Sequence, residues 1–271
     1  MFIGWIRKKS FSNDLEAFAK NVIIDKSLIV KTFERDQSLC FGAYNENSLV
    51  AFISAYELNS QILINNFYYL PQTEDDIKKR VVKLLLNNLS NSTKTILFML
   101  RKDETHIINS FGFEEYAKFK KAIYRGSNIP FNFTNAMAKS ISNENFMPLI
   151  INMNKRALSE DKTEYIKEAL LKESSLVLSN TVGYQHSYSL NKTIVKISPW
   201  IMEDAAFSDA EKMLRGVIYH RGLKKLFAFI PSEVKEITDL YASYKFDLSD
   251  EYVLVYKNQK PSINLEMLYA F

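Results

Sequence analysis

Two similar stretches of sequence decide the fold that we expect. "VAFISAYELNSQI" runs from Val50 to Ile62, and "VGYQHSYSLNKTI" runs from Val182 to Ile194. Aligned without a gap, they share Val50/Val182, Tyr56/Tyr188, Leu58/Leu190, Asn59/Asn191 and Ile62/Ile194. Each stretch has the pattern of a strand, an Asn-containing turn and a second strand. The repeat predicts that the chain contains the same structural unit twice.

The elements around these stretches recur in the same order. "NSFGF" at 109–113 corresponds to "ASYKF" at 242–246, and "ILFML" at 96–100 takes the same place as "FAFIP" at 227–231. Such an ordered series of matches is difficult to obtain by chance. Each half therefore predicts a helical start, three antiparallel strands, a helix, a strand, a short helix and a final strand.

The expected elements follow from apolar periodicity and turn residues. In the first half we expect helix 13–36, strands 38–44, 49–58 and 61–71, helix 74–89, strand 94–100, a short helix 103–113 closed by Gly112, and strand 116–126. In the second half we expect helices 143–158 and 163–175, strands 176–180, 182–190 and 193–202, helix 208–222, strand 224–231, helix 232–246 and strand 251–258. The expected N-caps include Thr73, Ser208 and Ser232.

The length and composition fit a globular protein of two domains. The chain has 271 residues, of which 47% are hydrophobic and 24% are charged. We expect a first lobe at 1–126, a linker at 127–139 and a second lobe at 140–271, because the stretch 126–145 around the linker is richer in Gly, Pro, Asn and Ser. The apolar segment "INLEMLYAF" at 263–271 is expected to dock on a neighbouring lobe or on a second chain, which leaves a homodimer open.

Charge and cysteine content exclude several classes of protein. The 35 basic and 31 acidic residues give a net charge of +4, which is too small an excess for a dedicated nucleic-acid binder. The lysines of the stretch 116–126 are interpreted as protection of an edge strand, with RNA binding as the alternative. The single Cys40 predicts a buried thiol, and no apolar run is long enough for a membrane span. We therefore expect a cytoplasmic protein.

The order of elements resembles the GCN5-related N-acetyltransferase (GNAT) superfamily, here in tandem. The resemblance covers about residues 10–126 and 140–258. "NNFYYLPQ" at 65–72 stands where the family has an apolar strand ending in Val-x-Pro, and "IINSFGF" and "LYASYKF" resemble the family's "FYEKLGF" wording. The resemblance implies an α+β fold with two GNAT-like lobes, each a twisted mixed β-sheet flanked by α-helices.

In this superfamily the fourth and fifth strands separate, and the pantetheine arm of acyl-CoA binds between them. The pyrophosphate then lies at the start of the next helix, where backbone N–H groups and the helix dipole favour an anion. If this carries over to the first lobe, the residues that would contact acetyl-CoA or another acyl-CoA are Phe67, Tyr68, Tyr69, Leu70, Gln72, Lys78 and Lys79.

Both pyrophosphate loops depart from the family pattern Gln/Arg-x-x-Gly-x-Gly/Ala. In the first lobe Glu74, Asp75 and Asp76 stand at the phosphate position without any glycine, and "MEDAAFSDAEKM" in the second lobe is also acidic and glycine-free. Carboxylates at a helix start compensate the dipole, so they oppose a second anion there. Lys78, Lys79 and Arg80 would offset these charges in part, or form an exposed charged face.

The catalytic candidates come partly from the resemblance. The family's general acid, a Tyr four residues before the Gly of its motif, corresponds to Ile108 in the first lobe and to Tyr241 in the second. The other interpretation of Tyr241 is a helix tyrosine half-buried against the sheet. Glu57 and His186 lie on predicted strands and are candidate bases, with an ordinary structural role as the alternative. No spacing of His, Cys or carboxylates suggests a metal site.

Two functional hypotheses remain open. The first is an acyl-CoA-dependent N-acyltransferase, in the simplest case an N-acetyltransferase, acting on a small amine or a peptide amine without a metal. The second is a catalytically degenerate GNAT-fold protein that serves as a binding or scaffold protein. The retained order of elements and Tyr241 favour the enzyme, while the missing glycines favour the scaffold.

Overall fold

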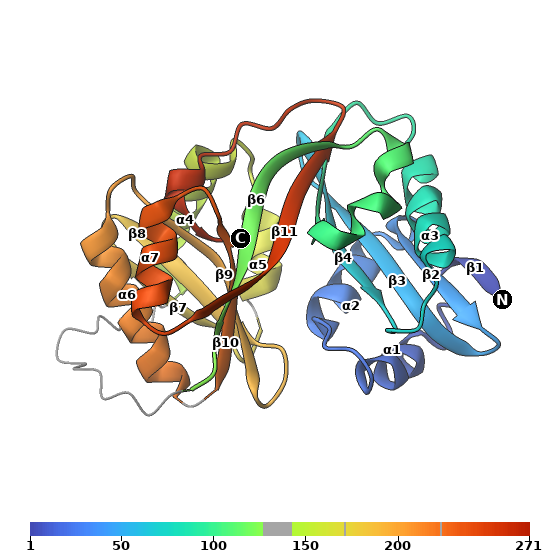
Figure 1. Cartoon of the computed structure of the whole chain (residues 1–271), viewed down its shortest axis with the longest axis horizontal. Coiled ribbons are helices and arrows are strands. Elements are labelled where there is room, and N and C mark those ends of the chain that lie inside the picture. The colour runs from blue at the N-terminus through green and yellow to red at the C-terminus, as the bar shows by residue number, and fades with distance from the viewer. Residues whose placement is uncertain (127–142, 171, 223) are drawn as a thin grey trace. The chain divides into compact units, whose positions relative to one another are not determined.

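A computed structural model describes residues 1–126, 143–170, 172–222 and 224–271. The expected linker at 127–139 lies outside the described residues. The chain forms two compact units (Figure 1). Unit 1 consists of residues 1–116 and 253–260, and unit 2 consists of residues 117–252 and 261–271. Both units combine helices with a mixed β-sheet, which confirms the expected α+β class.

Unit 1 begins with an edge strand that the sequence pattern does not predict. Its elements are β1 (Phe2–Trp5), α1 (Phe11–Ala19), α2 (Lys26–Arg35), η1 (Gln37–Leu39), β2 (Cys40–Asn45), β3 (Ser48–Glu57), β4 (Gln61–Tyr69), α3 (Asp75–Asn88), β5 (Thr95–Arg101), η2 (Lys102–Ile107) and η3 (Asn109–Phe111). The strand order is β1-β2-β3-β4-β5-β11, where β11 (Asp247–Lys257) belongs to unit 1 from residue 253 on. The pair β4–β5 is parallel, and the pairs from β1 to β4 are antiparallel.

Helices cover both faces of this sheet. Val81, Val82 and Leu85 of α3 pack on one face, and α1 and α2 pack on the other through Leu15 and Phe33. Because β3 and β4 are buried on both faces, they read as nearly continuous apolar runs. The single helix expected at 13–36 is two helices in the structure. The second one starts where Asp25 caps it, because its Oδ1 accepts a hydrogen bond from the N–H of Leu28 at 3.1 Å.

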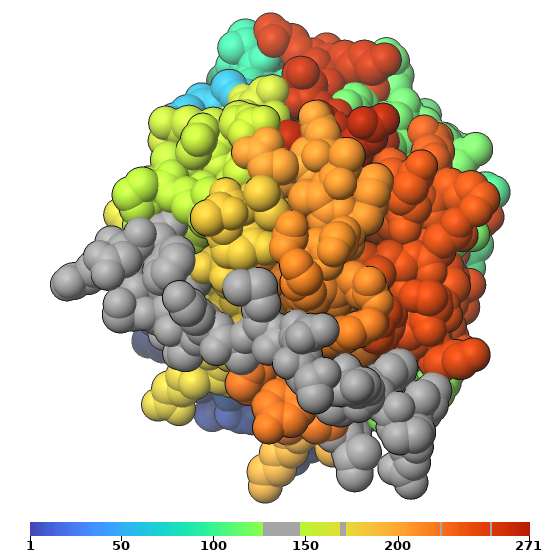
Figure 2. Space-filling model, turned by 90° about the vertical axis from the view of Figure 1, so that its left-hand side faces the viewer, coloured from blue at the N-terminus to red at the C-terminus, as the bar shows by residue number. Residues whose placement is uncertain are grey.

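Unit 2 has a similar order of elements. They are β6 (Glu114–Tyr124, from residue 117 on), α4 (Asn143–Leu158), α5 (Thr163–Leu170), β7 (Leu176–Asn180), β8 (Gly183–Ser189), β9 (Ile194–Met202), α6 (Phe207–Arg221), β10 (Lys225–Pro231), α7 (Lys235–Ser243), β11 (Asp247–Lys257, up to residue 252), η4 (Leu265–Met267) and β12 (Leu268–Ala270). The strand order is β11-β6-β10-β9-β8-β7, and β12 pairs with β9. Helices α6 and α7 form much of the surface in Figure 2, in orange and orange-red.

The allocation of two strands differs from the continuous lobes that we expect from the sequence. β6 pairs antiparallel with β10, with Ala122 opposite Ala228, so residues 117–124 belong to unit 2. Val253 and Val255 of β11 pack instead in the core of unit 1. Each unit is thus assembled from two segments that are distant in sequence.

The expected edge strand with protective lysines is wrong. In unit 2, β6 lies between β11 and β10 and is therefore an interior strand of the sheet. The Nζ atom of Lys121 lies 5.5 Å from the centre of the Phe227 ring, so this lysine covers an aromatic side chain of the neighbouring strand.

The two similar stretches of sequence form the hairpins β3–β4 and β8–β9, as predicted. Both hairpins shift register at the same place in the repeat. In the first, Ser54 is opposite Asn66 while Ala55 is opposite Ile64, so Asn65 is an extra residue. In the second, the shift falls between Gln185 and Ser187. A bulge of this kind bends a strand and changes where its pairing can continue.

Candidate functional site

β4 and β5 separate after a short paired stretch. Their parallel pairing joins Gln61–Ile64 to Thr95–Phe98, although β4 continues to Tyr69 and β5 to Arg101. Over residues 61–101, which the structure describes in full, the pairing ends one residue before the bulge at Asn65. We call the space between residues 65–69 and 99–101 the unit 1 opening. Alternate backbone groups of β4 point toward β5 and can therefore pair with an extended ligand.

Polar side chains fix the bulge from the α2 side. Asn66 is 1% exposed, and its Nδ2 donates to Ser54 Oγ at 2.9 Å. Ser54 Oγ donates in turn to Asn65 Oδ1 at 3.0 Å, and Asn65 Nδ2 donates to Thr32 Oγ1 at 2.8 Å. Neighbouring residues at a bulge can point to the same face of the sheet, as these two asparagines do. The point where β4 leaves β5 is therefore held by hydrogen bonds to β3 and α2.

The residues expected to contact the cofactor arm lie at the end of β4. Phe67 and Tyr69 pack with the α3 face of the sheet, whereas Tyr68 and Leu70 pack with the α1–α2 face. The hydroxyl of Tyr68 accepts a hydrogen bond from the N–H of Asp25 at 3.3 Å. Burial, followed by the Asp25 charge, raises the pKa of Tyr68. Because these side chains are committed to packing, this segment would offer mainly its backbone to a ligand.

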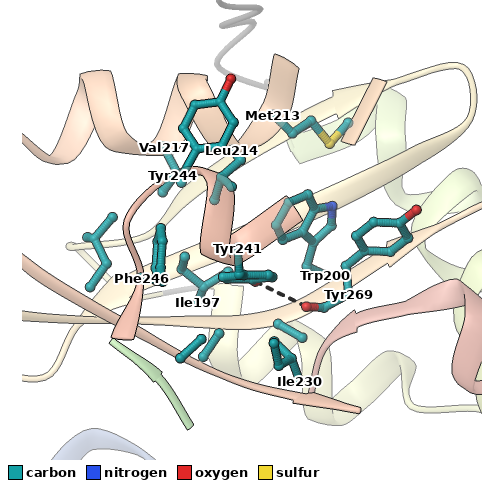
Figure 3. Packing of buried hydrophobic residues seen from close by; sticks show 14 of the residues in the cluster. Ile197, Trp200, Met213, Leu214, Val217, Ile230, Tyr241, Tyr244, Phe246 and Tyr269 are labelled. Carbon is teal, nitrogen blue, oxygen red and sulfur yellow. Dashed lines mark hydrogen bonds between the residues drawn. The ribbon is translucent and has the colours of Figure 1, made fainter. Parts of the chain in front are cut away.

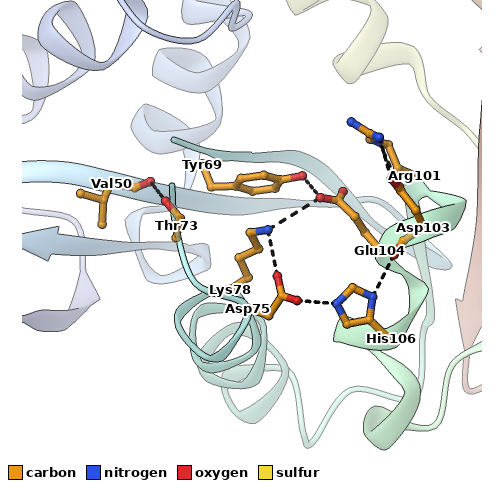
Figure 4. A network of polar contacts seen from close by, with 9 residues as sticks. All are labelled: Val50, Tyr69, Thr73, Asp75, Lys78, Arg101, Asp103, Glu104 and His106. Carbon is orange, nitrogen blue, oxygen red and sulfur yellow. Dashed lines mark hydrogen bonds and ion pairs between the residues drawn. The ribbon is translucent and has the colours of Figure 1, made fainter. Parts of the chain in front are cut away.

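A network of polar side chains surrounds the start of α3 (Figure 4). The Nζ atom of Lys78 lies 3.0 Å from Asp75 Oδ1, 3.9 Å from Glu104 Oε1 and 4.2 Å from the centre of the Tyr69 ring. The hydroxyl of Tyr69 donates to Glu104 Oε1. Lys78 is only 8% exposed, so the expected exposed charged face is wrong for this residue. The network links β4, α3 and η2 beside the unit 1 opening.

His106 completes this network. Its Nε2 lies 2.6 Å from Asp75 Oδ2, and its Nδ1 lies 2.9 Å from the carbonyl oxygen of Asp103. Both ring nitrogens of His106 therefore have an oxygen partner within the chain. Hydrogen bonds from His106 and then from Lys78 lower the pKa of Asp75. The first turn of α3 therefore already holds an anion supplied by the chain itself.

The remaining residues at this helix start are more accessible. Gln72 is exposed in the turn before α3, and Lys79 is half-buried. The expected cap, Thr73, donates its hydroxyl to the carbonyl oxygen of Val50 at 3.1 Å, and Glu74 occupies the N-cap position without a side-chain bond. Ser208 and Ser232 are not caps either, because the N-cap positions of α6 and α7 are Ala206 and Val234.

Unit 2 has a comparable separation of strands, but β12 fills it. The pairing of β9 with β10 covers only Ile194–Lys196 with Lys225–Phe227. Beyond it, Leu268 is opposite Ile201 and Ala270 is opposite Trp200, in antiparallel pairing of β12 with β9. The expectation that this segment docks on a neighbouring lobe or a second chain is therefore wrong, since it docks within its own unit.

Tyr241 lies in the core of unit 2, with its side chain directed toward Tyr269 of this strand (Figure 3). It is 0% exposed, and its hydroxyl donates to the carbonyl oxygen of Tyr269 in β12 at 3.0 Å. Its ring centre lies 4.9 Å from that of Phe246 and 5.8 Å from that of Trp200. Burial raises the pKa of Tyr241 well above its usual value. The hydroxyl is therefore committed to holding β12.

The two candidate bases lie in different units. Glu57 is the last residue of β3, opposite Ile62, at the end of β4 where β4 and β5 are paired rather than separated. Its Oε1 lies 2.8 Å from Lys94 Nζ. His186 is 0% exposed, with Nδ1 2.8 Å from the carbonyl oxygen of Ser198 and Nε2 3.0 Å from Ser175 Oγ. Both ring nitrogens of His186 thus have partners inside the protein.

The structure brings together residues that the sequence indicated separately and others that it did not. Tyr69 and Lys78 are among the predicted contacts, and Asp75 is one of the acids noted at the start of α3. Glu104 and His106 are additions. Their position in the sequence could have indicated them. Because β4 and β5 are parallel, the segment that follows β5 lies at the same edge of the sheet as the segment that follows β4.

Three further observations concern classes of site. Among the described residues, no group of three or more His, Cys, Asp or Glu side chains is placed to hold a metal ion. None of the described helices is both long enough and apolar enough to cross a membrane. Cys40 is 0% exposed, as expected for a buried thiol, and burial together with the Asp36 charge raises its pKa to about 12.

Comparisons with solved structures identify the fold. A putative acetyltransferase from Pyrococcus horikoshii matches with a TM-score of 0.78 and 15% identity, covering 100% of this chain and 93% of that chain. A GCN5-related N-acetyltransferase from Sphaerobacter thermophilus matches with a TM-score of 0.62 and 12% identity, covering 98% of both chains. A tandem GNAT protein from the clavulanic acid biosynthesis pathway matches with a TM-score of 0.63 and 8% identity, covering 94% of this chain and 98% of that chain.

Sequence comparisons add nothing to this. No protein-family model matches the chain, and no curated protein matches it. The structural likeness extends over the whole chain, so the chain has the fold of the GCN5-related N-acetyltransferases.

Proposed function

We propose that this chain, which has the GNAT fold, is an acyl-CoA-dependent N-acyltransferase whose unit 1 binds the cofactor. In the simplest case it transfers an acetyl group to a small amine or a peptide amine. The observation that carries the proposal is the unit 1 opening, which places the part of β4 beyond its pairing with β5 directly before the start of α3. An extended amide-containing arm fits such an edge, and a pyrophosphate fits a helix start.

Residues at both ends of the opening would contribute to binding. The backbone of Phe67, Tyr68, Tyr69 and Leu70 would pair with the pantetheine arm. Gln72 and Lys79 would lie near the pyrophosphate, where both have accessible side chains. Lys78 would exchange the Asp75 carboxylate for a phosphate oxygen, because its ammonium group already lies at the first turn of α3. The Asp75–His106 pair would then have to turn away from the incoming anion.

The reaction itself needs few catalytic side chains. The neutral amine attacks the carbonyl carbon of the thioester, a C–N bond forms, and the C–S bond breaks to release a thiolate. The amine loses a proton to water, and the thiolate gains one. Ile108, which stands at the family's acid position, is 3% exposed and has no proton to donate. A thiol has a pKa of about 8.5, so a thiolate can leave without a donor more readily than an alkoxide could.

Thermal melting with and without acetyl-CoA tests the proposal. A ligand at a hundred times its dissociation constant adds about 2.7 kcal/mol to the free energy of unfolding, which raises the Tm by several degrees. ATP at the same concentration controls for unspecific binding of phosphates. If acetyl-, succinyl- and longer acyl-CoA all leave the Tm unchanged, the acyltransferase proposal is wrong.

Two observations favour a second candidate, a GNAT-fold binding or scaffold protein. Asp75 and Glu104 place carboxylates at the start of α3 in unit 1, and β12 fills the separated strands of unit 2. This candidate predicts no Tm shift with any acyl-CoA. A homodimer and a cytoplasmic location stay predictions, which light scattering and cell fractionation would test.

A further inference from the structure

We propose that β12 is a strand that the chain supplies to itself, filling the separated strands of unit 2 in place of a cofactor arm. Unit 2 therefore takes no acyl-CoA, and the protein binds one acyl-CoA per chain. The statement about stoichiometry rests on the proposed function, whereas the statement about β12 does not.

Backbone hydrogen bonds place β12 between the two strands. Its antiparallel pairing with β9 sets Leu268 opposite Ile201 and Ala270 opposite Trp200. On the other side, the N–H of Phe271 donates to the carbonyl oxygen of Phe229 in β10 at 2.9 Å. β12 thus uses backbone groups of both strands beyond the point where their mutual pairing ends. These groups are the ones that an extended ligand would need.

Side chains hold the strand in the core. Leu268, Tyr269 and Ala270 are each 0% exposed, and the ring of Tyr269 lies 5.2 Å from that of Trp200. The Tyr241 hydroxyl donates to the Tyr269 carbonyl oxygen and so fixes the middle of the strand. A tethered strand competes with a free ligand at an effective concentration on the order of millimolar. An acyl-CoA would have to displace both the backbone bonds and this packing.

Unit 1 shows no equivalent strand. Among residues 1–116 and 253–260, which the structure describes in full, β4 and β5 are direct neighbours in the sheet and no third strand lies between them. The two units therefore differ in the one feature that decides whether an extended ligand can enter.

Trp200 offers a direct readout of β12. The chain has two tryptophans, and Trp5 is 64% exposed on β1 while Trp200 is 0% exposed. Trp5→Phe leaves Trp200 as the single emitter. We expect acrylamide to quench the Trp200 fluorescence only weakly, and saturating acetyl-CoA to leave this quenching unchanged. We also expect calorimetry to give one acetyl-CoA per chain. Two per chain, or a quenchable Trp200 after acetyl-CoA is added, would overturn the proposal.

Two variants in the Trp5→Phe background test the contacts of β12. Tyr241→Phe removes the hydroxyl that bonds Tyr269, and Phe271→Pro removes the N–H that bonds Phe229. Both should increase acrylamide quenching of Trp200 several-fold while circular dichroism shows an intact fold. Tyr219→Phe, at a 58% exposed position on α6, is the matched control and should change nothing. If neither β12 variant increases quenching, β12 does not fill this place.

The same experiment separates the two proposals. If the native chain binds no acetyl-CoA, the acyltransferase proposal fails. In that case the quenching data still decide on β12: a protected Trp200 that both variants expose supports the strand, and a Trp200 that is already accessible in the native chain refutes it.

Discussion

At the residue scale, Asp75 is the side chain that most directly opposes the proposed cofactor. It lies in the first turn of α3, where His106 and Lys78 hold it in its charged form. Because His106 and Lys78 both contact its carboxylate, its removal would free both side chains for a phosphate. The acidic start of α3 is then a property that a single substitution can change.

We predict that Asp75→Asn strengthens acetyl-CoA binding. Removal of the carboxylate charge removes its repulsion of the phosphates, so the Kd should fall by about fivefold. Calorimetric titration measures the change. Asp239→Asn, which removes an equal charge from an exposed ion pair with Lys235 in unit 2, is the control and should leave the Kd unchanged. An unaltered Kd in Asp75→Asn would show that phosphates do not bind at the start of α3.

Asp161 should make part of the stability depend on pH. It accepts hydrogen bonds from the side chain and N–H of Thr163 at the start of α5, and with Lys155 these lower its pKa to about 2. A lowered carboxyl pKa adds stability above the unfolded value of about 3.9, and this is lost as pH falls toward 2. Solvent screening limits the contribution to about 1 kcal/mol.

We therefore predict that Asp161→Asn lowers the free energy of unfolding at pH 6, and that about half of the difference remains at pH 3. Urea denaturation at the two pH values measures it. Glu164→Gln, in the first turn of α5 and paired with Lys167, is the control. A difference that stays constant from pH 6 to pH 3 would contradict the assignment to this carboxylate.

At the element scale, corresponding helices in the two units are followed by the same left-handed backbone conformation, which is occupied by different residues. η3 is followed by Gly112 with a φ of 72°, and α7 is followed one residue later by Lys245 with a φ of 61°. Both are in the left-handed region, which costs a residue with a side chain about 1 kcal/mol. The matched "NSFGF" and "ASYKF" stretches thus share a backbone conformation that only one of them satisfies with glycine.

We predict opposite effects at these two positions. Lys245→Gly should stabilise the protein by about 0.5 kcal/mol, since the freedom of glycine in the unfolded chain offsets part of the relief. Gly112→Ala should destabilise it by about 1 kcal/mol, because a Cβ there would also lie 3.1 Å from Lys257 Nζ. Urea denaturation of both variants measures the effects. A loss of stability in Lys245→Gly would contradict this prediction. It would mean that a contact of the Lys245 side chain stabilises the protein by more than the left-handed backbone destabilises it.

Local pattern predicted the elements well, but it did not predict which strands pair. The hairpins β3–β4 and β8–β9 and the helix α3 follow from alternation and helical spacing. The position of β12 does not follow from the pattern, because the sequence of a three-residue apolar strand does not indicate which strand it pairs with. Tyr241 shows the same limit at the site: its spacing matched a catalytic position, and the strand that binds its hydroxyl lies far along the chain.

At the scale of the whole molecule, neither unit is a continuous piece of sequence. Unit 1 takes residues 253–260, and unit 2 takes residues 117–124. Val253 and Val255 are 1% and 4% exposed in the core of unit 1, so their absence would leave apolar surface of β5 uncovered. Boundaries drawn in the middle of the chain therefore do not separate two independent domains.

We predict that residues 1–126 alone do not form a stable fold, whereas the same fragment expressed together with residues 127–271 does. The first fragment lacks the β11 segment that completes its sheet. Circular dichroism and size-exclusion chromatography measure folding and association. A cooperative melt of the isolated fragment at the Tm of the full chain would contradict this prediction.

The same arrangement affects how the protein is made. Domains commonly fold in the order in which they leave the ribosome. Here the earlier unit lacks its last strand until residue 257 has emerged, after most of unit 2 has been translated. During synthesis, β5 is therefore an unprotected border to which a chaperone or another nascent chain could bind.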